Sequence, residues 1–288
     1  MGLMEPTVSE WFYERFDDLT EPQSKAIPVI HERRNVLVSS PTGSGKTLTA
    51  FTSIINELVR YASEGRLEER IYCIYISPLK ALANDVNRNL NGPLEEMRRI
   101  AEERGLTVPD IRVAVRSGDT SQSDRQKMVR RPPHILITTP ESLSLILAAP
   151  KFSESFKDVE WVILDEIHDI CESKRGVLLS LSLERLRHFC NRDFTRIGLS
   201  ATLAPMDAIA GYLVGCDPDG GIRDVALIES DSKKMLDLEV ICPTEDMTTL
   251  SSDIVNSMMY DKLKDLVDTH ETTLIFTNTR SGAESVVY

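Results

Sequence analysis

A short glycine-containing segment carries the clearest chemical signal in the sequence. Ser39–Thr47 reads SSPTGSGKT and directly follows the apolar run Val36–Val38. Glycine tolerates positive φ and lets backbone N–H groups approach a phosphate, while a following lysine and hydroxyl can reach the β/γ-phosphates and Mg²⁺. The usual pattern has its first glycine where this sequence has Ser40. The segment therefore predicts a nucleotide site with one anomaly.

The loop and the first turn of the next helix are expected to hold the phosphates. Lys46 would contact the β/γ-phosphates, and the Thr47 hydroxyl would ligate Mg²⁺. A chance match in a flexible loop is the alternative, but the apolar strand before the loop and the amphipathic helix after it favour a nucleotide site. The residues predicted to bind nucleotide here are Thr42, Gly43, Ser44, Gly45, Lys46, Thr47 and Leu48.

Two adjacent acids follow another apolar run. Trp161–Leu164 reads as a buried strand and leads into Asp165 and Glu166. Ligands of open α/β sheets bind at the carboxyl ends of the strands, so we expect both acids beside the phosphate loop. Asp165 would hold Mg²⁺ and Glu166 would polarise an attacking water. The alternative is an exposed acidic turn that caps a helix.

Seven short apolar runs are predicted to be strands that position these residues. Continuous rather than alternating apolarity is typical of a parallel sheet covered on both faces, and helical patterns lie between the runs. This alternation predicts an α/β fold with a mostly parallel central sheet flanked by helices. The runs are Val36–Ser39, Ile71–Ser77, Ile111–Arg116, His134–Thr139, Trp161–Asp165, Arg196–Ser200 and Thr272–Asn278.

The pattern also predicts the domain organisation. One domain covers residues 1–242, a polar linker covers 243–253, and residues 254–288 begin a second domain. Apolar residues at helical spacing follow the glycine loop as far as Gly65, and Val177–Phe189 is predicted to be a helix although its first half alternates like a strand. Residues 254–288 supply a helix, a strand and part of a helix, which cannot bury their apolar faces alone. We therefore expect a truncated second domain, with self-association through this tail as one outcome.

Composition points to an intracellular protein without membrane spans. The 288 residues are 41% hydrophobic, with no apolar run long enough for a bilayer, and five scattered cysteines argue against disulfides or a zinc site. We expect a cytoplasmic location. Although the net charge is −12, residues 86–131 carry ten Lys/Arg against seven Asp/Glu. This segment is compatible with a nucleic-acid surface, and equally with a solvated mixed-charge face.

The segments PTGSGKT, DEIH and Ser200-Ala201-Thr202 together resemble motifs of superfamily-two helicases. Longer segments of the chain are similar to those of the Lhr (large helicase-related) family. PTGSGKT, DEIH and Ser200-Ala201-Thr202 stand in the order of that superfamily's motifs I, II and III, and its first motif often has Ala or Ser at the position of Ser40. The likeness covers nearly the whole chain. The longer matching segments are YISPLKALANDV, TTPESLSLILAAPKF, DVEWVILDEIHDICESKRG and IFTNTRSGAE.

The resemblance implies two RecA-like domains and roles for individual residues. Lys46, Asp165 and Glu166 would be catalytic, Gln23 would read the adenine of ATP, and Thr47 and Asp165 would hold Mg²⁺. His168, Ser200 and Thr202 would couple the γ-phosphate to domain movement. The residues implied to contact a DNA or RNA single strand are Pro78, Lys80, Gly118, Asp119, Thr139, Pro140, Asn278, Thr279 and Arg280. Thr139–Ser142 also reads as an ordinary helix start with proline in its first turn.

The resemblance also implies what is missing. The family's motifs V and VI, with their arginine finger, belong to the second domain and have no match here. We therefore expect this chain to bind ATP and a strand without unwinding alone, while the whole protein would move 3′→5′ on DNA, in repair. Two alternatives remain open at this point. A nucleotide-responsive clamp would not turn ATP over, and a small-molecule kinase would share the phosphate loop but leave the strand-facing motifs unexplained.

Overall fold

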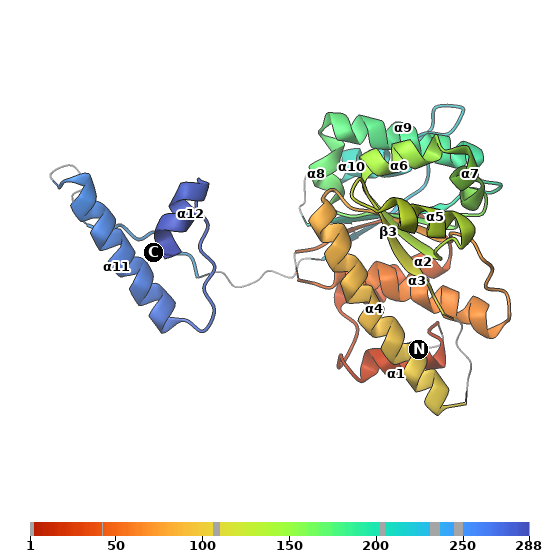
Figure 1. Cartoon of the computed structure of the whole chain (residues 1–288), viewed down its shortest axis with the longest axis horizontal. Helices are drawn as coiled ribbons and strands as arrows, with labels where there is room; N and C mark the ends of the chain where they lie inside the picture. Colours follow the sequence, from red (N-terminus) through yellow and green to blue (C-terminus); the bar gives the residue numbers. More distant parts are fainter. Residues whose placement is uncertain are drawn as a thin grey trace. The chain divides into compact units, whose positions relative to one another are not determined.

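The computed structural model describes residues 3–41, 43–105, 110–201, 205–230, 237–244 and 250–287. Contacts within the chain divide it into two compact units, Met1–Ser232 and Lys233–Tyr288, both drawn in Figure 1. Residues 237–244 contain no helix or strand, and 245–249 lie outside the described residues. The domain limits at 242 and 253 stay predictions.

A parallel sheet forms the centre of the first unit. Its seven strands run in the order β3-β4-β2-β5-β6-β1-β7, and every described strand pair is parallel. The register places Ser39 beside Ser200, so the ends of β1 and β6 lie together. The strands are β1 (Val36–Ser39), β2 (Cys73–Ile76), β3 (Val113–Arg116), β4 (Ile135–Thr138), β5 (Trp161–Leu164), β6 (Thr195–Ser200) and β7 (Ala226–Glu229).

The predicted α/β class is confirmed, with two corrections to the strands. The predicted strand Thr272–Asn278 is wrong: these residues form no ladder, because no other described strand of the second unit is available to pair with them. Strand β7 was not predicted. It lies at the sheet edge and buries only Ile228 of its four residues, although Val225–Ile228 is a continuous apolar run.

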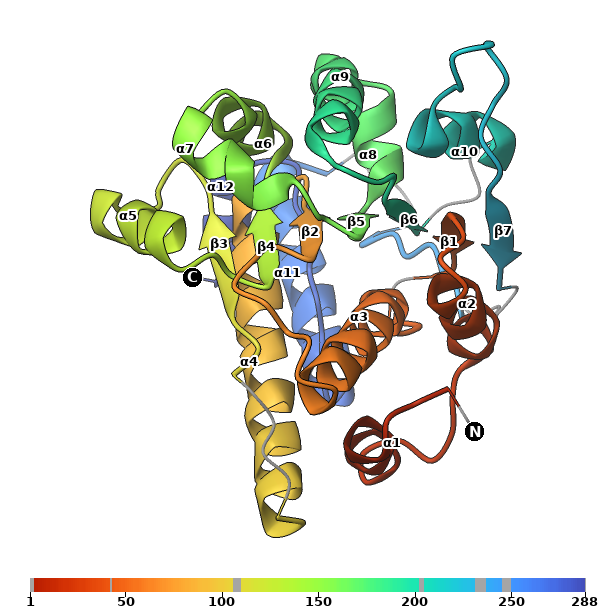
Figure 2. The same cartoon turned by 90° about the vertical axis from the view of Figure 1, so that its right-hand side faces the viewer.

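Helices cover both faces of this sheet (Figure 2). One face is packed by α1 to α4, and the other by the helices from α5 to α10. The helices of the first unit are α1 (Pro6–Tyr13), α2 (Glu21–His31), α3 (Lys46–Ser63), α4 (Lys80–Glu103), α5 (Gln122–Arg130), α6 (Pro140–Leu147), α7 (Pro150–Ser153), the 3₁₀ helix η1 (Glu154–Phe156), α8 (Ile167–Cys171), α9 (Lys174–Phe189) and α10 (Met206–Val214).

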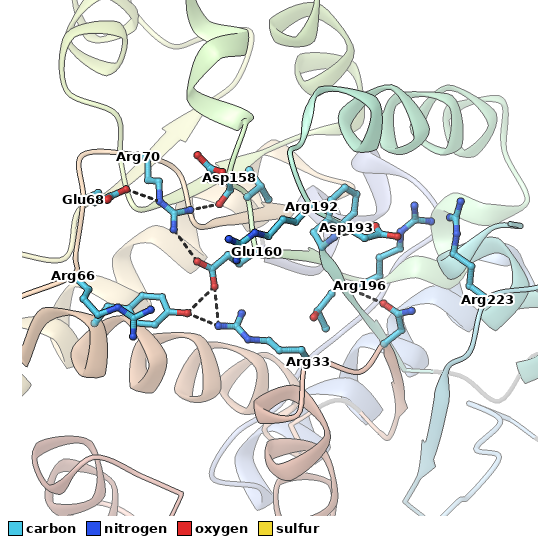
Figure 3. A pocket seen from close by; sticks show the side chains of 15 residues that line it. Arg33, Arg66, Glu68, Arg70, Asp158, Glu160, Arg192, Asp193, Arg196 and Arg223 are labelled. Atoms are coloured by element: carbon cyan, nitrogen blue, oxygen red, sulfur yellow. Dashed lines mark hydrogen bonds and ion pairs between the residues drawn. The ribbon is translucent and has the colours of Figure 1, made fainter. Parts of the chain in front are cut away.

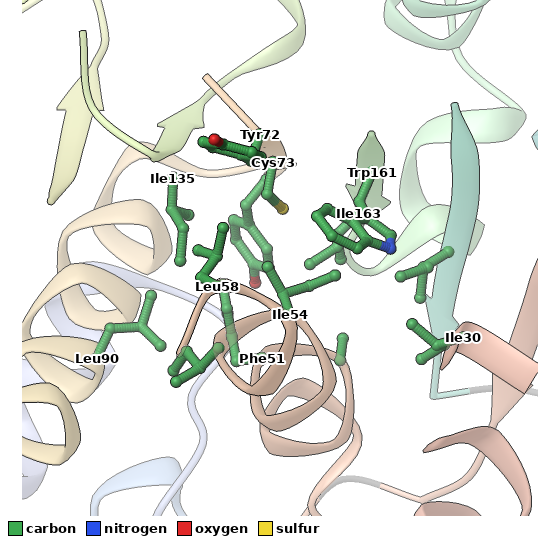
Figure 4. Close-up of a cluster of buried hydrophobic side chains, with 14 of the residues drawn as sticks. Ile30, Phe51, Ile54, Leu58, Tyr72, Cys73, Leu90, Ile135, Trp161 and Ile163 are labelled. Carbon is green, nitrogen blue, oxygen red and sulfur yellow. The ribbon is translucent and has the colours of Figure 1, made fainter. Parts of the chain in front are cut away.

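The helix after the glycine loop is anchored deep in the core. Phe51, Ile54 and Leu58 of α3 are at most 2% exposed and pack against β-strand side chains such as Trp161 and Ile163 (Figure 4). Each such burial contributes roughly 1.5–3 kcal/mol. Because α3 is fixed in this way, the loop that precedes it has one defined place at the end of β1.

The predicted helices are confirmed in both units. Helix α3 begins at Lys46, the segment Val177–Phe189 lies within α9, and the second unit contains α11 (Ser252–Thr269) and α12 (Arg280–Val287). Across the described ranges, no helix is both long enough and apolar enough to cross a membrane.

Candidate functional site

The glycine loop has the backbone geometry that its glycines predict. Gly43 and Gly45 have φ values of 81° and 83°, in the left-handed region. Ser40 is not among the described residues with positive φ, so its position does not require a glycine. Instead the Ser40 and Ser44 hydroxyls form a 2.6 Å hydrogen bond across the loop. The anomaly at Ser40 thus has a structural reason. Thr42 lies outside the described residues.

Lys46 is buried at the start of α3. Its side chain is 6% exposed, and Nζ donates hydrogen bonds to the Ser40 and Pro41 carbonyl oxygens, the latter at 3.1 Å. Burial lowers the pKa of the ammonium group, whereas the charges of Glu166 and Asp165 raise it. A phosphate would offer this ammonium a charged acceptor, which forms stronger hydrogen bonds than a neutral carbonyl.

Gln23 lies directly against the phosphate loop. Its Oε1 accepts a hydrogen bond from the Thr20 amide at 2.8 Å, the reciprocal half of a capping box at the start of α2. A Cβ added to Gly45 would stand 2.9 Å from Gln23 Nε2. The Thr20 hydroxyl also donates to the Ser44 carbonyl oxygen at 3.3 Å. The structure therefore brings the proposed adenine reader and the loop together, while the contact between Gln23 and adenine stays a prediction.

The two acids emerge at the end of β5, as expected. Asp165 is 4% exposed, and burial raises the pKa of its carboxyl group while a hydrogen bond donated by the Tyr75 hydroxyl lowers it. Its Oδ1 accepts the Glu166 amide at 3.0 Å. The alternative of an exposed acidic turn is excluded for Asp165 by its burial. Sequence reasoning missed Tyr75, because a tyrosine in the middle of β2 carries no local sign of a distant acidic partner.

Glu166 occupies a strained backbone position. It has φ 45° and ψ 47°, which a non-glycine residue rarely adopts, and it stands just before α8. Burial and the neighbouring Asp165 charge raise the pKa of its carboxyl group. Glu166 Oε2 is buried and accepts no hydrogen bond from the described residues. An acceptor of this kind suits a water molecule that must be oriented for attack.

The residues present fit a magnesium–nucleotide complex. No cluster of three or more His, Cys, Asp or Glu side chains in the described part of the chain could hold a metal ion by itself. Mg²⁺ usually takes one or two protein carboxylates and completes its shell with phosphates and water, so Asp165 with the Thr47 hydroxyl is a sufficient protein contribution. Thr47 and Leu48 both lie in the first turn of α3.

His168 connects the acidic pair to the end of β6. Its Nδ1 lies 3.2 Å from the Ser200 hydroxyl and 3.6 Å from Glu166 Oε2. The Ser40 amide in turn donates to the Ser200 carbonyl oxygen at 3.1 Å. The phosphate loop, the acidic pair and Ser200 therefore form one connected network. Thr202 lies outside the described residues.

The residues implied to contact a nucleic-acid strand form two groups in the first unit. Lys80 begins α4, and its Nζ lies 2.9 Å from Asp119 Oδ1, beside Gly118. Thr139 is the N-cap of α6 and Pro140 its first residue, so the ordinary helix start is confirmed. Thr139 is 3% exposed, so its side chain serves the cap rather than an open surface. Asp119 acts as the counter-ion of Lys80.

The remaining residues implied to contact a nucleic-acid strand lie in the second unit. Asn278 and Thr279 precede α12, and Arg280 is its first residue. The Thr279 hydroxyl accepts the Gly282 amide at 3.0 Å, which caps the helix start. The structure thus places these three residues at one helix N-terminus.

The cation-rich segment 86–131 is a mixed-charge surface over most of its length. Arg98 and Arg99 face Glu102 and Glu103 one turn along α4. Pairs of this kind are screened by water and contribute little energy.

A cavity of about 630 Å³ lies at the other end of the sheet from the phosphate loop (Figure 3). Glu160 immediately precedes β5, so the cavity lies at the amino ends of the parallel strands, whereas the phosphate loop follows β1. Arg33 and Arg70 both pair with Glu160, at 2.8 and 2.9 Å, and the Tyr61 hydroxyl donates to it at 2.8 Å. Because Arg33 and Arg70 share the Glu160 carboxylate, this network ties strand starts together.

Comparison with known proteins finds a matching family model and similar proteins. The family model described as DEAD/DEAH box helicase matches residues 20–209. The chain is 56% identical over 287 residues to the ATP-dependent helicase Lhr-Core of Methanothermobacter thermautotrophicus, covering 100% of this chain and 33% of that protein. It is 36% identical over 300 residues to the Lhr helicase/uracil glycosylase of Escherichia coli, covering 98% of this chain and 19% of that protein.

A solved structure of a similar protein extends the comparison. The Mycobacterium smegmatis helicase Lhr, bound to ssDNA and AMP-PNP, superposes with a TM-score of 0.86 at 40% identity, covering 99% of this chain and 35% of that one. The chain therefore spans 33% of the length of the Methanothermobacter relative and 35% of the Mycobacterium chain.

Proposed function

Because the chain belongs to the DEAD/DEAH box helicase family, we propose that it is the ATP-binding part of a motor that couples ATP hydrolysis to movement along a nucleic-acid strand. The observation that best supports this proposal is the buried Lys46, which follows the loop after β1, while Asp165 and Glu166 follow β5 of the same parallel sheet. Phosphoryl transfer to water requires a cation that binds the phosphates, a carboxylate that binds the metal ion and a second carboxylate that orients the attacking water.

ATP would be held by the loop and by α2. The backbone around Gly43 and Gly45 would wrap the β-phosphate, with the positive end of the α3 dipole toward the anion. Lys46 would exchange its carbonyl acceptors for phosphate oxygens. Gln23 would donate to the adenine edge through Nε2, since its Oε1 is engaged by the Thr20 amide. This contact would favour purine nucleotides, since N7 of a purine accepts the hydrogen bond.

The acidic pair would divide the chemistry. Thr47 and Asp165 would hold Mg²⁺, which when bound supplies positive charge that offsets the charge developing on the phosphoryl oxygens. The hydrogen bond that Tyr75 donates would orient Asp165 and favour the ionised form of its carboxylate. Glu166 Oε2 would accept a hydrogen bond from the attacking water and take its proton as the oxygen–phosphorus bond forms. The raised pKa of Glu166 brings its basicity closer to neutral pH.

Strand contact would be made mainly to sugar and phosphate. Backbone groups and the Lys80 ammonium would meet the strand, so binding would be independent of base sequence and would weaken with salt. The relative in the solved structure is bound to ssDNA, which supports single-stranded DNA as the first substrate to test. Changes at the γ-phosphate would reach these loops through Glu166, His168 and Ser200.

The present chain alone would bind ATP and a strand weakly, hydrolyse ATP slowly and not unwind. The arginine finger of related motors stands in a second domain, and its loss typically costs about 10³–10⁵ in rate. We therefore place unwinding with the full-length protein.

Comparing ATP hydrolysis by the full-length protein with single-stranded DNA, single-stranded RNA and no polymer tests this function. We expect at least one polymer to stimulate hydrolysis about tenfold or more, in a manner lost as salt rises. Hydrolysis that no polymer changes would instead indicate a small-molecule enzyme, and ATP binding without hydrolysis would indicate a nucleotide-responsive clamp. A Lys46→Ala variant should lose nucleotide binding and serves as the negative control.

A further inference from the structure

Arg175 connects two loops that are far apart in the sequence. It lies in the first turn of α9, and its guanidinium donates to the Pro78 carbonyl oxygen through Nη2 at 2.7 Å. The same group meets the Glu141 carboxylate through Nε at 2.5 Å and Nη2 at 3.3 Å. Pro78 precedes α4, and Glu141 lies in the first turn of α6. One planar side chain therefore spans the two segments that are proposed to contact a strand.

The backbone next to Arg175 is packed against α8, the helix that follows Asp165 and Glu166. A Cβ added to Gly176 would stand only 2.3 Å from the Ile170 carbonyl oxygen, so the start of α9 is pressed against the end of α8. The Tyr212 hydroxyl donates to the Gly176 carbonyl oxygen at 2.8 Å, and Ser173 caps α9. Because α8 begins immediately after Glu166, the position of Arg175 is tied to the water-orienting acid by a few tightly packed residues.

Arg175 also changes the charge that a strand would meet. The Glu141 side chain is 47% exposed, and its hydrogen bond with Arg175 is the largest cause of its lowered pKa. Without Arg175, an unpaired carboxylate would stand beside Thr139 and Pro140, where it would repel phosphate. Arg175 therefore has two distinct effects. It sets the spacing of the two loops, and it neutralises the charge of Glu141.

We propose that Arg175 is a positioning residue that holds the Pro78 loop and the start of α6 at the spacing a nucleic-acid strand requires, and that links this spacing to α8. The proposal deepens the proposed function and rests on it. A lysine could keep the charge but could not span the Pro78 carbonyl oxygen and the Glu141 carboxylate together, because the ammonium lacks the planar fork.

Strand-stimulated ATP hydrolysis by the full-length protein, measured against the concentration of a single-stranded DNA oligonucleotide, tests this role. We expect Arg175→Ala to raise the half-activating strand concentration about tenfold, the range for losing charged hydrogen bonds, with the rate at saturating strand within about threefold of wild type. Arg175→Lys should raise the half-activating strand concentration about fivefold relative to wild type. Arg187→Ala, which removes an ion pair to Asp193 elsewhere on α9, is the matched control and should behave as wild type.

The double variant Arg175→Ala/Glu141→Gln separates positioning from charge. If it restores wild-type strand dependence, or if Arg175→Lys does so, Arg175 acts only by neutralising charge and the positioning role is overturned. Unaltered strand dependence in Arg175→Ala overturns the proposal entirely. A wild-type protein that no strand stimulates would instead refute the proposed function, so the two failures are distinguishable. Thermal unfolding of each variant identifies any loss of folding, and a folded Arg175→Lys keeps the test decisive.

Discussion

The Tyr75 hydroxyl donates a hydrogen bond to the Asp165 carboxylate at the junction of β2 and β5. Burial raises the pKa of this carboxyl group, and the hydrogen bond is the largest opposing influence. The hydrogen bond from Tyr75 therefore favours the ionised form of this buried acid, which is the form that binds a metal ion.

Replacing Tyr75 by phenylalanine should change the pH dependence of ATP hydrolysis. Loss of the hydrogen bond raises the pKa of Asp165 further, so activity should begin to fall at a higher pH as the solution is acidified. Rates of Tyr75→Phe and wild type across the acidic range measure this shift. Tyr72→Phe is the matched control, since the Tyr72 hydroxyl accepts the Glu68 amide and does not meet Asp165. Superimposable profiles for Tyr75→Phe and wild type would refute the role of Tyr75.

Replacing Gly45 by alanine should abolish nucleotide binding. Gly45 has φ 83°, which strains any other residue, and its added Cβ would stand 2.9 Å from Gln23 Nε2, so the Gln23 side chain must also move. Gly65→Ala is a matched control with φ 68° and nothing within 4 Å of the added Cβ. It should cost about 1 kcal/mol of stability through backbone strain alone and leave ATP affinity unchanged. Titration with a fluorescent ATP analogue compares the two, and equal affinities would contradict the account of the loop.

Replacing Glu160 by glutamine should destabilise the first unit without touching the nucleotide site. The change leaves Arg33 and Arg70 without their shared carboxylate, which is 23% exposed, and should lower the free energy of unfolding by about 2 kcal/mol. Glu68, 74% exposed and also facing Arg70, is the control, and Glu68→Gln should stay within about 0.5 kcal/mol. Urea denaturation gives both values. A Glu160→Gln protein as stable as Glu68→Gln would show that the network is not stabilising.

Replacing Glu166 by glutamine should increase stability at neutral pH. A carboxyl group whose pKa is raised by folding binds its proton more tightly in the folded state, so its charge opposes folding at neutral pH and that cost is relieved as pH falls through the raised pKa. Glutamine removes the charge at every pH. The urea midpoint of Glu166→Gln should therefore exceed that of wild type at pH 7, and the difference should shrink on acidification. A lower midpoint at pH 7 would contradict the electrostatic cost assigned to Glu166.

Local patterns predicted the centre of the fold and the positions of the catalytic candidates. Apolar runs followed by Gly45-Lys46 or by Asp165-Glu166 are signals within one segment, and the parallel sheet brings them together at one edge. The contacts of Tyr75 with Asp165 and of Arg175 with Pro78 could not be found in this way, since the paired residues lie 90 and 97 residues apart. The segment Thr272–Asn278 failed for a related reason, because a strand needs a partner as well as an apolar sequence.

The most direct test of the central claim is single-strand-stimulated ATP hydrolysis by the full-length Glu166→Gln protein compared with wild type. The account predicts that Glu166→Gln retains ATP binding while its stimulated rate falls by about 10²–10⁴, the usual contribution of a general base. A Glu166→Gln rate within threefold of the wild-type rate would contradict the assignment of this site to ATP hydrolysis.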